Sequence, residues 1–409
     1  MSEAAGDGGQ RHVRVAHLTT VASSLRFLLL PQLRAVRDLP GGTGEAVGIS
    51  AAGSDVEALE QEGFTHIALG SSTRSMNPLA DLRSARELWR ILRAENIDVL
   101  HTHNPKPGLY GRVVGRLARV PVVVNTNHGL YVTENNSLLQ RLVVLTMEAI
   151  AARFSHAELL QNPEDVDWLL KRHVNVRRRT KLLGNGIDLH RFRPGGVPES
   201  VRLSRREELA ARPDAIVVGM VGRLVVEKGF RELFEAARTL RERFPDGRYV
   251  VVAIGPDDPE KADAISPEEI RAAEELGVVF LGHRLDVEAL YAAMDMFVLP
   301  SYREGFPRAA MEAAASGLPI VATDVRGCRQ VVEHDVTGLL VPVRDGAALA
   351  EAIIALGDDP TRREAMSKAA ITRAQDNFDE RKVVQIVLDT YREVAARKGR
   401  QDLVTALGG

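Results

Sequence analysis

Residues 215–229 read AIVVGMVGRLVVEKG, and this stretch decides the fold class. Its first part, residues 215–221, is an apolar run rich in β-branched residues, which is typical of a buried strand. A turn bounded by Gly222 and Gly229 follows, and the turn leads into a helical stretch. A strand, a turn and a helix in this order indicate the α/β class.

The same order repeats along the chain. From Arg14 onward, short apolar runs alternate with amphipathic helical stretches, and no hairpin signal separates them, which predicts parallel sheets. In the first half we expect seven strands, at residues 14–20, 45–51, 65–70, 98–103, 121–127, 156–162 and 181–187. In the second half we expect six, at residues 215–221, 249–255, 278–282, 296–300, 319–324 and 339–343. Each set of strands with its intervening helices predicts one doubly wound domain.

A break between the two sets lies at residues 191–200, RFRPGGVPES, where two prolines and two adjacent glycines exclude a helix or a central strand. We therefore expect a first domain at residues 1–193 and a second domain at residues 194–378. The last segment, residues 379–409, has the periodicity of a helix, and we expect it to pack back on the first domain. The apolar stripes of residues 78–96 and 137–154 are expected to be core.

Composition limits the class of protein. With 409 residues, of which 45% are hydrophobic and 26% charged, the chain is neither disordered nor fibrous and can bury large cores. The formal net charge of −2 gives no general attraction to nucleic acid, so we expect no nucleic-acid partner. The single cysteine, Cys328, needs no oxidising compartment, and the start, MSEAAGDGGQ, has no signal-peptide pattern. We expect a cytoplasmic protein without a transmembrane segment.

The segment with the most chemical information is residues 302–318, YREGFPRAAMEAAASGL, between two expected strands. Pro307 suits the first turn of a helix, which places Glu304 on the entry loop and Glu312 inside the helix. The loop at residues 305–307 lets backbone N–H groups approach a ligand, and the helix N-terminus favours a phosphate there. Two acids around a phosphate seat suit the recognition of hydroxyl groups.

A second segment, GRLVVEKG at residues 222–229, lies directly after an expected strand, at the carboxyl edge where doubly wound folds bind ligands. Its two cations are Arg223 and Lys228. Across one strand-to-helix turn they can converge on a diphosphate, the guanidinium as a bidentate fork and the ammonium as a point charge. A pair of surface cations has no such role by itself, but the helix after Gly305 opens at the same edge.

Together these segments resemble the large family of retaining glycosyltransferases with the GT-B fold. EGFPRAAME fits the E-x7-E signature of the family, and GRLVVEKG fits its phosphate loop. The resemblance covers nearly the whole chain, because it also includes HTHNPKPGLYGR at residues 101–112, VNTNHGLY at 124–131, QNPED at 161–165 and GNGIDLHRF at 184–192. Those segments are most similar to the bacterial subgroup that builds lipid-linked or exported polysaccharides.

The resemblance implies two Rossmann-like domains that face each other across a cleft, with C-terminal helices crossing back. Arg223 and Lys228 would hold the donor diphosphate and stabilise the charge of the leaving nucleotide. Glu312 would bind the ribose hydroxyls, and Glu304 would bind hydroxyls of the donor sugar. We assign catalysis to His128, Arg223, Lys228 and Glu304. We assign donor binding to Gly222, Arg223, Lys228, Gly282, Arg284, Glu304, Gly305, Phe306, Pro307 and Glu312.

On the acceptor side we place Thr20, Ser24, Arg26 and Lys106, and His128 would face the reacting centre from the first domain. We identify no Asp-x-Asp metal motif, so we expect no metal ion and no other cofactor, with charge neutralised by the two cations and by helix N-termini. His101 and His103 share one face of an expected strand, but without an evident third ligand we interpret them as structural.

The implied reaction moves a sugar, most often from a UDP-sugar, to an acceptor hydroxyl with retention of anomeric configuration, and closure of the cleft would exclude water. Three other classes fit the sequence less well. A glycoside hydrolase does not need phosphate-binding residues. A nicotinamide-dependent oxidoreductase needs GxGxxG, where only Gly219 and Gly222 stand. A non-catalytic nucleotide-sugar-binding protein has no need of both cations, both acids and His128.

Two classes of acceptor remain open. Residues 1–195 carry 24 Lys and Arg against 19 Asp and Glu, and residues 171–181, KRHVNVRRRTK, are strongly basic. Together with the apolar residues 25–30, they favour peripheral binding to the inner face of the cell membrane and a lipid-linked acceptor in cell-surface polysaccharide or glycolipid assembly. The alternative is a soluble small-molecule acceptor, with the basic segment merely solvated.

Overall fold

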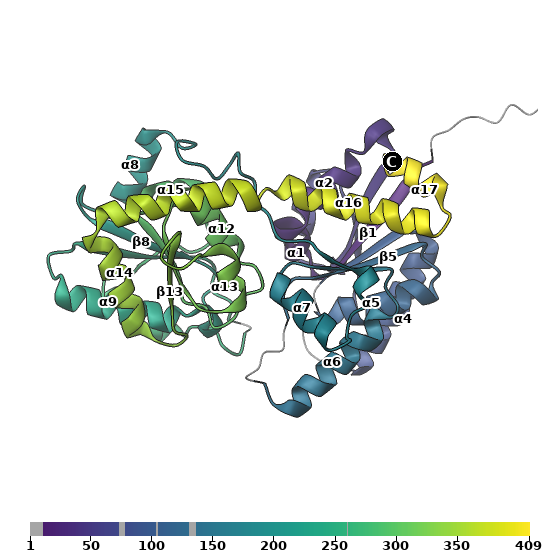
Figure 1. Cartoon of the computed structure of the whole chain (residues 1–409), viewed down its shortest axis with the longest axis horizontal. Coiled ribbons are helices and arrows are strands. Elements are labelled where there is room, and N and C mark those ends of the chain that lie inside the picture. The colour runs from purple at the N-terminus through teal and green to yellow at the C-terminus, as the bar shows by residue number, and fades with distance from the viewer. Residues whose placement is uncertain (1–10, 73–77, 104, 131–135, 260) are drawn as a thin grey trace, which may run out of the picture. The chain divides into compact units, whose positions relative to one another are not determined.

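The computed structural model describes residues 11–72, 78–103, 105–130, 136–259 and 261–409 (Figure 1). The start of the chain, to which the signal-peptide expectation applies, lies outside the described residues, as do Asn104 and Tyr131 of the quoted motifs. The chain divides into two compact units. Unit 1 is Met1–Gly184 with Arg381–Gly409, and unit 2 is Asn185–Glu380.

Unit 1 is built on a seven-stranded parallel sheet in the order β3-β2-β1-β4-β5-β6-β7. Its strands are β1 (Val13–Val21), β2 (Gly44–Ala51), β3 (Thr65–Ala68), β4 (Val99–His103), β5 (Val122–Asn127), β6 (Ala157–Leu160) and β7 (Thr180–Leu182). All seven expected strands are confirmed. The strand order reverses at β1, whose two neighbours are β2 and β4, and such a switch point is where doubly wound sheets bind ligands.

Helices cover both faces of the first sheet. One face is packed by α1 (Ala22–Leu28), α2 (Leu30–Arg37) and the C-terminal helices α16 (Glu380–Arg397) and α17 (Gln401–Ala406), through buried residues such as Leu33 and Tyr391. The other face is packed by α4 (Pro78–Ala94) and α5 (Pro105–Leu117). The remaining helices of unit 1 are α3 (Val56–Gln61), α6 (Leu138–Ala152) and α7 (Pro163–Lys171), with short 3-10 turns at Pro40–Gly42 and Arg177–Arg179.

Unit 2 repeats the plan with six parallel strands in the order β10-β9-β8-β11-β12-β13. The strands are β8 (Ile216–Val221), β9 (Tyr249–Ile254), β10 (Val279–Phe280), β11 (Met296–Leu299), β12 (Ile320–Thr323) and β13 (Gly338–Val341). All six expected strands are confirmed. The switch point lies between β8 and β11, so the segments after these strands are the ones that reach a ligand.

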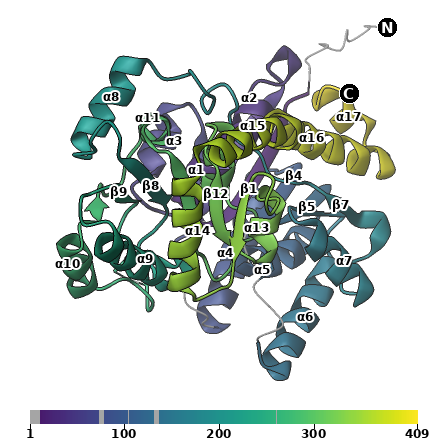
Figure 2. The same ribbon diagram turned by 60° about the vertical axis from the view of Figure 1, so that its left-hand side comes forward.

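The helices of unit 2 also form two layers (Figure 2). One layer contains α9 (Phe230–Arg243) and α14 (Gly346–Asp358), and the other contains α11 (Val287–Ala293), α12 (Arg308–Ala315) and α15 (Pro360–Asn377). The remaining helices are α8 (Glu199–Glu208), α10 (Pro267–Glu275), α13 (Arg326–Val331) and the 3-10 turn η3 (Val226–Lys228). Both units are therefore doubly wound, as expected.

The chain crosses between the units at Gly184–Asn185 and again at Glu380–Arg381, where we expected crossings at 193–194 and 378–379. Ile187 and Phe192 are buried in the core of unit 2, so the segment before the proline-rich stretch already belongs there. Residues 381–409 belong to unit 1, in which Tyr391, Val394 and Leu403 are buried.

Two expectations about core residues are wrong. In α4, Leu88 and Leu92 are buried, but Leu79, Leu82 and Trp89 of the same stripe are exposed. The Leu and Met residues of α6 were expected in the core, yet most of them lie at the surface, Leu138 and Leu139 with exposed fractions of 80% and 70%. Periodicity shows which side chains share a face of a helix but does not show what that face contacts.

Candidate active site

At the carboxyl edge of the unit 2 sheet, backbone groups of three loops lie close together. The loops after β8, β9 and β10 join there, because Gly222 N donates to Ile254 O at 2.9 Å and Gly255 N donates to Gly282 O at 2.8 Å. Gly255 has φ 146°, and a Cβ on it would lie 1.9 Å from Gly222 O. Only glycine permits this close approach, so Gly255 allows the two loops to pack against each other at the edge.

The two predicted cations lie on this edge, each with an acidic partner. Arg223 pairs with Asp258 at 2.7 Å, and nearly half of its side chain is exposed. Lys228, at the end of η3, places its Nζ 2.6 Å from Oε1 of Glu304. Gly229 follows with φ 84°, and a Cβ there would lie 2.1 Å from Pro300 O, so glycine fixes the turn that starts α9.

The first predicted acid, Glu304, is held in a rigid loop. Its carboxylate accepts from Ser301 Oγ at 2.8 Å and from Lys228, and its side chain is 9% exposed. The carbonyl oxygen of Phe306 accepts from Asn185 Nδ2 at 3.0 Å. We expected Pro307 in the first turn of α12, and this is wrong: Pro307 is the residue before the helix, because its ψ of 114° is extended.

The second predicted acid, Glu312, lies inside α12 and faces the interior. Tyr291 Oη donates to its Oε2 at 3.2 Å, and Arg308 lies 3.9 Å away. Burial raises the pKa of Glu312 above its usual value of 4.5, although the Arg308 charge opposes this effect. Besides these contacts with Tyr291 and Arg308, the Glu312 carboxylate can accept hydrogen bonds from hydroxyl groups of a ligand.

The side chain of Arg284 is already bonded to acidic residues of the protein. Its guanidinium makes two bonds of 2.7 Å to Asp286 and also pairs with Glu208, and these bonds raise its pKa. Gly282, two residues earlier, has φ 60° and no atom within 4 Å of a built Cβ. The segment therefore presents open backbone at Gly282 and an engaged side chain at Arg284.

The carboxyl edge of the unit 1 sheet contains a chain of buried histidines. His17 on β1 places its Nδ1 3.0 Å from Nε2 of His103 on β4, and His103 Nδ1 lies 3.1 Å from Nε2 of His128, which follows β5. Burial lowers the pKa of His17 to about 3 and that of His128 to about 4, and it holds the pKa of His103 well below 6.5. These imidazoles are neutral at pH 7.

The sequence analysis missed His17. In the sheet, β1 and β4 pair so that His17 lies beside His101, and the rings of His101 and His103 have centroids 4.1 Å apart. Nitrogens of His17, His101 and His103 all lie within 4.8 Å of one another, so a third candidate metal ligand does exist. Both nitrogens of His101 are engaged, however, with Tyr391 at 2.6 Å and Thr126 at 2.7 Å.

An Asp-x-Asp triplet is also present, at residues 165–167, and this corrects the sequence analysis. Asp165 lies in the first turn of α7, where its Oδ2 accepts from Leu130 N at 3.1 Å. The triplet belongs to a helix of unit 1 and is not part of the cation-lined edge of unit 2.

An apolar pocket of about 260 Å³ opens beside His128. Lys106, one of the predicted acceptor-side residues, lines it and pairs with Asp81. Leu109 of α5 and Val144, Leu145 and Met147 of α6 form most of its apolar wall. The other predicted acceptor-side residues, Thr20, Ser24 and Arg26, lie at the end of β1 and on α1 and do not line this pocket; Arg26 pairs with Asp55 at 2.8 Å.

Comparisons with known proteins give a consistent result. Residues 10–186 match the family described as glycosyl transferase 4-like domain, and residues 215–359 match the glycosyl transferases group 1. The UDP-Gal:alpha-D-GlcNAc-diphosphoundecaprenol alpha-1,3-galactosyltransferase of Escherichia coli is 29% identical over 335 residues, which cover 80% of this chain and 83% of that protein.

A D-inositol 3-phosphate glycosyltransferase of Kribbella flavida is 32% identical over 322 residues, covering 74% of each chain. Among solved structures, Anabaena Alr3699/HepE in complex with UDP and glucose matches with a TM-score of 0.77 at 22% identity, covering 93% of this chain and 99% of that one. This likeness supports the pair of Rossmann-like units described above.

Proposed function

This chain belongs to the group 1 glycosyltransferases and has the GT-B fold, and we propose that it moves a sugar from a UDP-sugar to a hydroxyl group of a lipid-linked acceptor with retention of configuration. The observation that carries the proposal is the open backbone edge of unit 2 with two cations on it, Arg223 and Lys228. A nucleoside diphosphate fits this edge, because its phosphates can pair with the two cations and its planar base can lie against exposed backbone.

The cations supply the main catalytic effect in this proposal. Lys228 is already oriented by Glu304 and Arg223 by Asp258, so little reorganisation is needed when charge develops on the leaving diphosphate. Glu304 then has a second acceptor oxygen for a hydroxyl of the donor sugar. Glu312 accepts hydrogen bonds from the ribose, and this is the reason for keeping a carboxylate buried in α12.

The acceptor hydroxyl attacks the anomeric carbon from the side of the departing diphosphate, and the leaving phosphate oxygen takes its proton. No carboxylate nucleophile is assigned, because Glu304 and Glu312 both have binding roles. His128 is neutral at pH 7, since burial lowers its pKa to about 4, so it contributes a hydrogen bond rather than a proton.

The acceptor is the less constrained half of the proposal. The Escherichia coli relative is named for a substrate linked to diphosphoundecaprenol, and the Kribbella flavida relative is named for D-inositol 3-phosphate. The apolar pocket beside His128 favours the lipid-linked class, with the protein peripheral at the inner face of the membrane. None of the described helices is both long enough and apolar enough to span a bilayer.

Calorimetric titration with UDP, GDP and dTDP tests the donor assignment, and we expect UDP to bind most tightly. The matching sugar nucleotides are then incubated with an undecaprenyl-diphosphate-linked N-acetylhexosamine and with D-inositol 3-phosphate. An α-linked product from an α-linked donor, identified by its NMR coupling constant, supports the proposal. A β-linked product contradicts retention, and UDP binding without turnover on either acceptor supports a non-catalytic binding protein.

A further inference from the structure

The helix α6 exposes several large apolar side chains on the face that points away from the protein. At about 3.6 residues per turn, Leu138, Leu142 and Thr146 lie on one face together with the adjacent Leu139, Val143 and Ile150. These apolar residues have large exposed fractions, 65% for Leu142 and 56% for Ile150. We call this set, Leu138, Leu139, Leu142, Val143 and Ile150, the outward face of α6.

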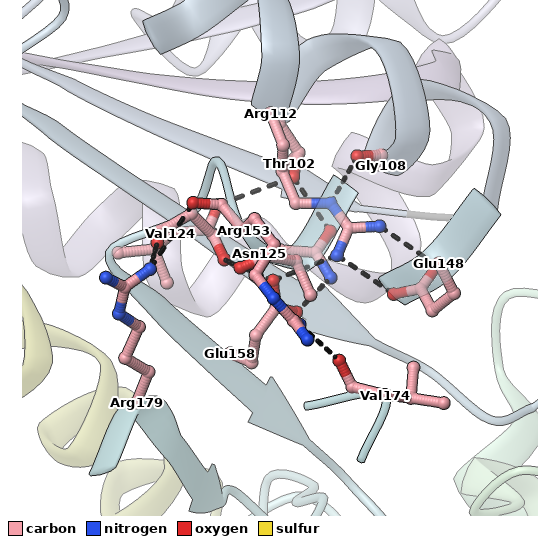
Figure 3. Close-up of polar contacts among 12 residues, drawn as sticks. Thr102, Gly108, Arg112, Val124, Asn125, Glu148, Arg153, Glu158, Val174 and Arg179 are labelled. Atoms are coloured by element: carbon pink, nitrogen blue, oxygen red, sulfur yellow. Dashed lines mark hydrogen bonds and ion pairs between the residues drawn. The ribbon is translucent and has the colours of Figure 1, made fainter. Parts of the chain in front are cut away.

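The charges of α6 lie on the opposite side. Its two charged residues, Arg141 and Glu148, are only partly exposed, and Glu148 pairs with Arg112 of α5 at 2.9 Å. Arg112 is 1% exposed and also binds Glu158, so the ion pair fixes which side of α6 faces the protein (Figure 3). The two charged residues of α6 therefore lie toward the protein, while five large apolar residues face outward, which is unusual for a helix whose outer face contacts only water.

A strongly basic segment is attached to the end of α6. Arg153, the residue after the helix, donates to Val174 O at 2.9 Å (Figure 3). Arg179 donates to Ser155 O at 3.1 Å. These bonds hold residues 171–181 against the end of the helix. Lys171, Arg172, Arg177 and Arg178 of that segment are exposed. The basic segment is therefore a direct neighbour of the C-terminal end of α6.

We propose that the outward face of α6 and the basic segment 171–181 form a docking surface for an anionic lipid bilayer. The outward face enters the acyl region of one leaflet, and the basic segment contacts the anionic head groups beside it. With 15 residues, α6 is about 22 Å long, against the ~30 Å of a hydrocarbon core, so it lies in the interface rather than across it.

The charge pattern distinguishes a bilayer from the other possible occupants. A second copy of this chain would bring two basic segments near each other or would need an acidic patch opposite them, whereas an anionic membrane matches an apolar strip with cations at one end. Each Lys or Arg near such a surface adds to the attraction, and salt weakens it.

The helix that carries the outward face also contributes to the apolar pocket. Val144, Leu145 and Met147 of α6 line that pocket together with His128. A helix inserted in one leaflet therefore brings the pocket to the depth of the head groups, where a lipid-linked hydroxyl acceptor is found. This last step rests on the proposed function, while the docking itself does not.

Co-sedimentation of the full chain with vesicles of equal parts phosphatidylglycerol and phosphatidylcholine tests the docking. We expect binding at low salt that weakens at high salt, and Leu139→Asp/Leu142→Asp lowers the partition coefficient roughly tenfold or more. Arg177→Glu/Arg178→Glu lowers it on anionic vesicles. The control Leu117→Asp/Leu203→Asp changes two exposed leucines outside the docking surface and leaves binding unchanged.

A label reports insertion without destabilising the helix. Cys328 is fully buried, so a cysteine introduced as Leu142→Cys is the one that reacts with an environment-sensitive fluorophore such as nitrobenzoxadiazole. Its emission shifts to the blue when the anionic vesicles are added, and the same label at Leu117→Cys does not shift. Absence of a shift at position 142 overturns the proposal, as does equal vesicle binding by Leu139→Asp/Leu142→Asp and the unchanged chain.

Failure of the docking and failure of the proposed function give different results. UDP affinity, measured on each variant, reports that unit 2 is intact. If the chain binds UDP and transfers sugar but does not bind the vesicles, the docking proposal alone is overturned. A chain that binds the vesicles through α6 but neither binds UDP nor transfers sugar overturns the proposed function alone. Loss of self-association in Leu139→Asp/Leu142→Asp, with vesicle binding unchanged, assigns the outward face to a second copy and overturns the docking.

Discussion

The two sheets have the same architecture, yet their carboxyl edges carry opposite chemistry. The edge of unit 2 has ion pairs and bare backbone, with Lys228 2.6 Å from Glu304 and glycines where three loops meet. The edge of unit 1 has neutral, fully buried imidazoles and an apolar pocket. One edge suits a charged leaving group, and the other suits an uncharged hydroxyl carried by an apolar molecule.

The difference teaches that fold and chemistry are set by different residues. Parallel βα repeats build both switch points, and the segments that follow the strands decide what each switch point binds. The same difference makes the two units respond differently to acid and to loss of a cation.

The largest expected effect is on stability in weak acid. Six histidines of unit 1 have lowered pKa values: His17, His66, His101, His103, His128 and His156. Because their folded pKa lies below the unfolded value near 6.5, the unfolded state binds more protons below that pH. Unit 1 therefore keeps its full stability above pH 6.5 and loses, for each fully buried histidine, about 1.4 kcal/mol per pH unit on the way down.

Unit 2 responds in the opposite sense through Glu312, whose raised pKa makes protonation favour the folded state. Calorimetric melts between pH 7.5 and 5, with hydrogen exchange to locate the first unit to open, check the contrast. We expect unit 1 to open first at pH 5, and replacing the exposed His173 by Asn leaves this behaviour unchanged. If unit 1 is equally stable at both pH values, the buried histidines do not have the lowered pKa values described above.

The next effect is on turnover. Lys228→Ala or Arg223→Ala removes a cation whose contact is strongest in the transition state, so we expect kcat to fall by ~10²–10³ with little change in KM. Steady-state kinetics with the UDP-sugar checks this, and Arg271→Ala, which breaks an exposed ion pair with Glu268, is the control. Unchanged kcat in both cation variants would move the donor site away from this edge.

A smaller effect is on nucleotide affinity. Glu312→Ala removes charged hydrogen bonds to the ribose, so UDP should bind about ten- to a hundredfold more weakly, with the larger share of the loss in Kd rather than kcat. Because the pKa of Glu312 is raised, its carboxylate becomes protonated at a higher pH than usual. As the pH is lowered, UDP affinity should therefore begin to fall above the usual glutamate pKa of 4.5. Titration calorimetry measures both, and a pH dependence that persists in Glu312→Ala would assign it to another group.

The smallest effect concerns metals, for which we expect no change. If Arg223 and Lys228 neutralise the diphosphate, transfer continues in EDTA at its original rate. Neither the histidine group of unit 1 nor the Asp165 triplet lies on the cation-lined edge. Loss of activity in EDTA that Mg²⁺ or Mn²⁺ restores would contradict this charge assignment.

The strands and the donor segments could be predicted from the sequence because their signals are local. Apolar runs between glycine-rich turns mark the strands. Residues 222–229 carry both cations within one turn, and residues 304–312 carry both acids within a loop and the helix that follows it. The contact between Lys228 and Glu304 joins residues 76 positions apart, and only the order of strands brings them together. Arg284 was assigned from the family resemblance, and its pairing with Asp286 and Glu208 follows from loop geometry that the resemblance does not contain.

The errors have a common physical origin in non-local contacts. His17 was missed because only the register between β1 and β4 places it beside His101. The apolar face of α6 was assigned to the core because apolar periodicity is the same whether a face meets protein, lipid or water. The Arg112 pairs with Glu148 and Glu158 decide that question, and they come from three separate elements.

The central claim is that the nucleotide binds at the carboxyl edge of unit 2 and not at that of unit 1. Hydrogen exchange of the full chain with and without saturating UDP tests it most directly. The account predicts that UDP slows exchange in unit 2, in the segments around residues 222–229, 282–284 and 304–308, and leaves residues 99–103 and 122–130 of unit 1 unchanged. Protection centred on His128 and its neighbours, with none at the segments of unit 2, would contradict it.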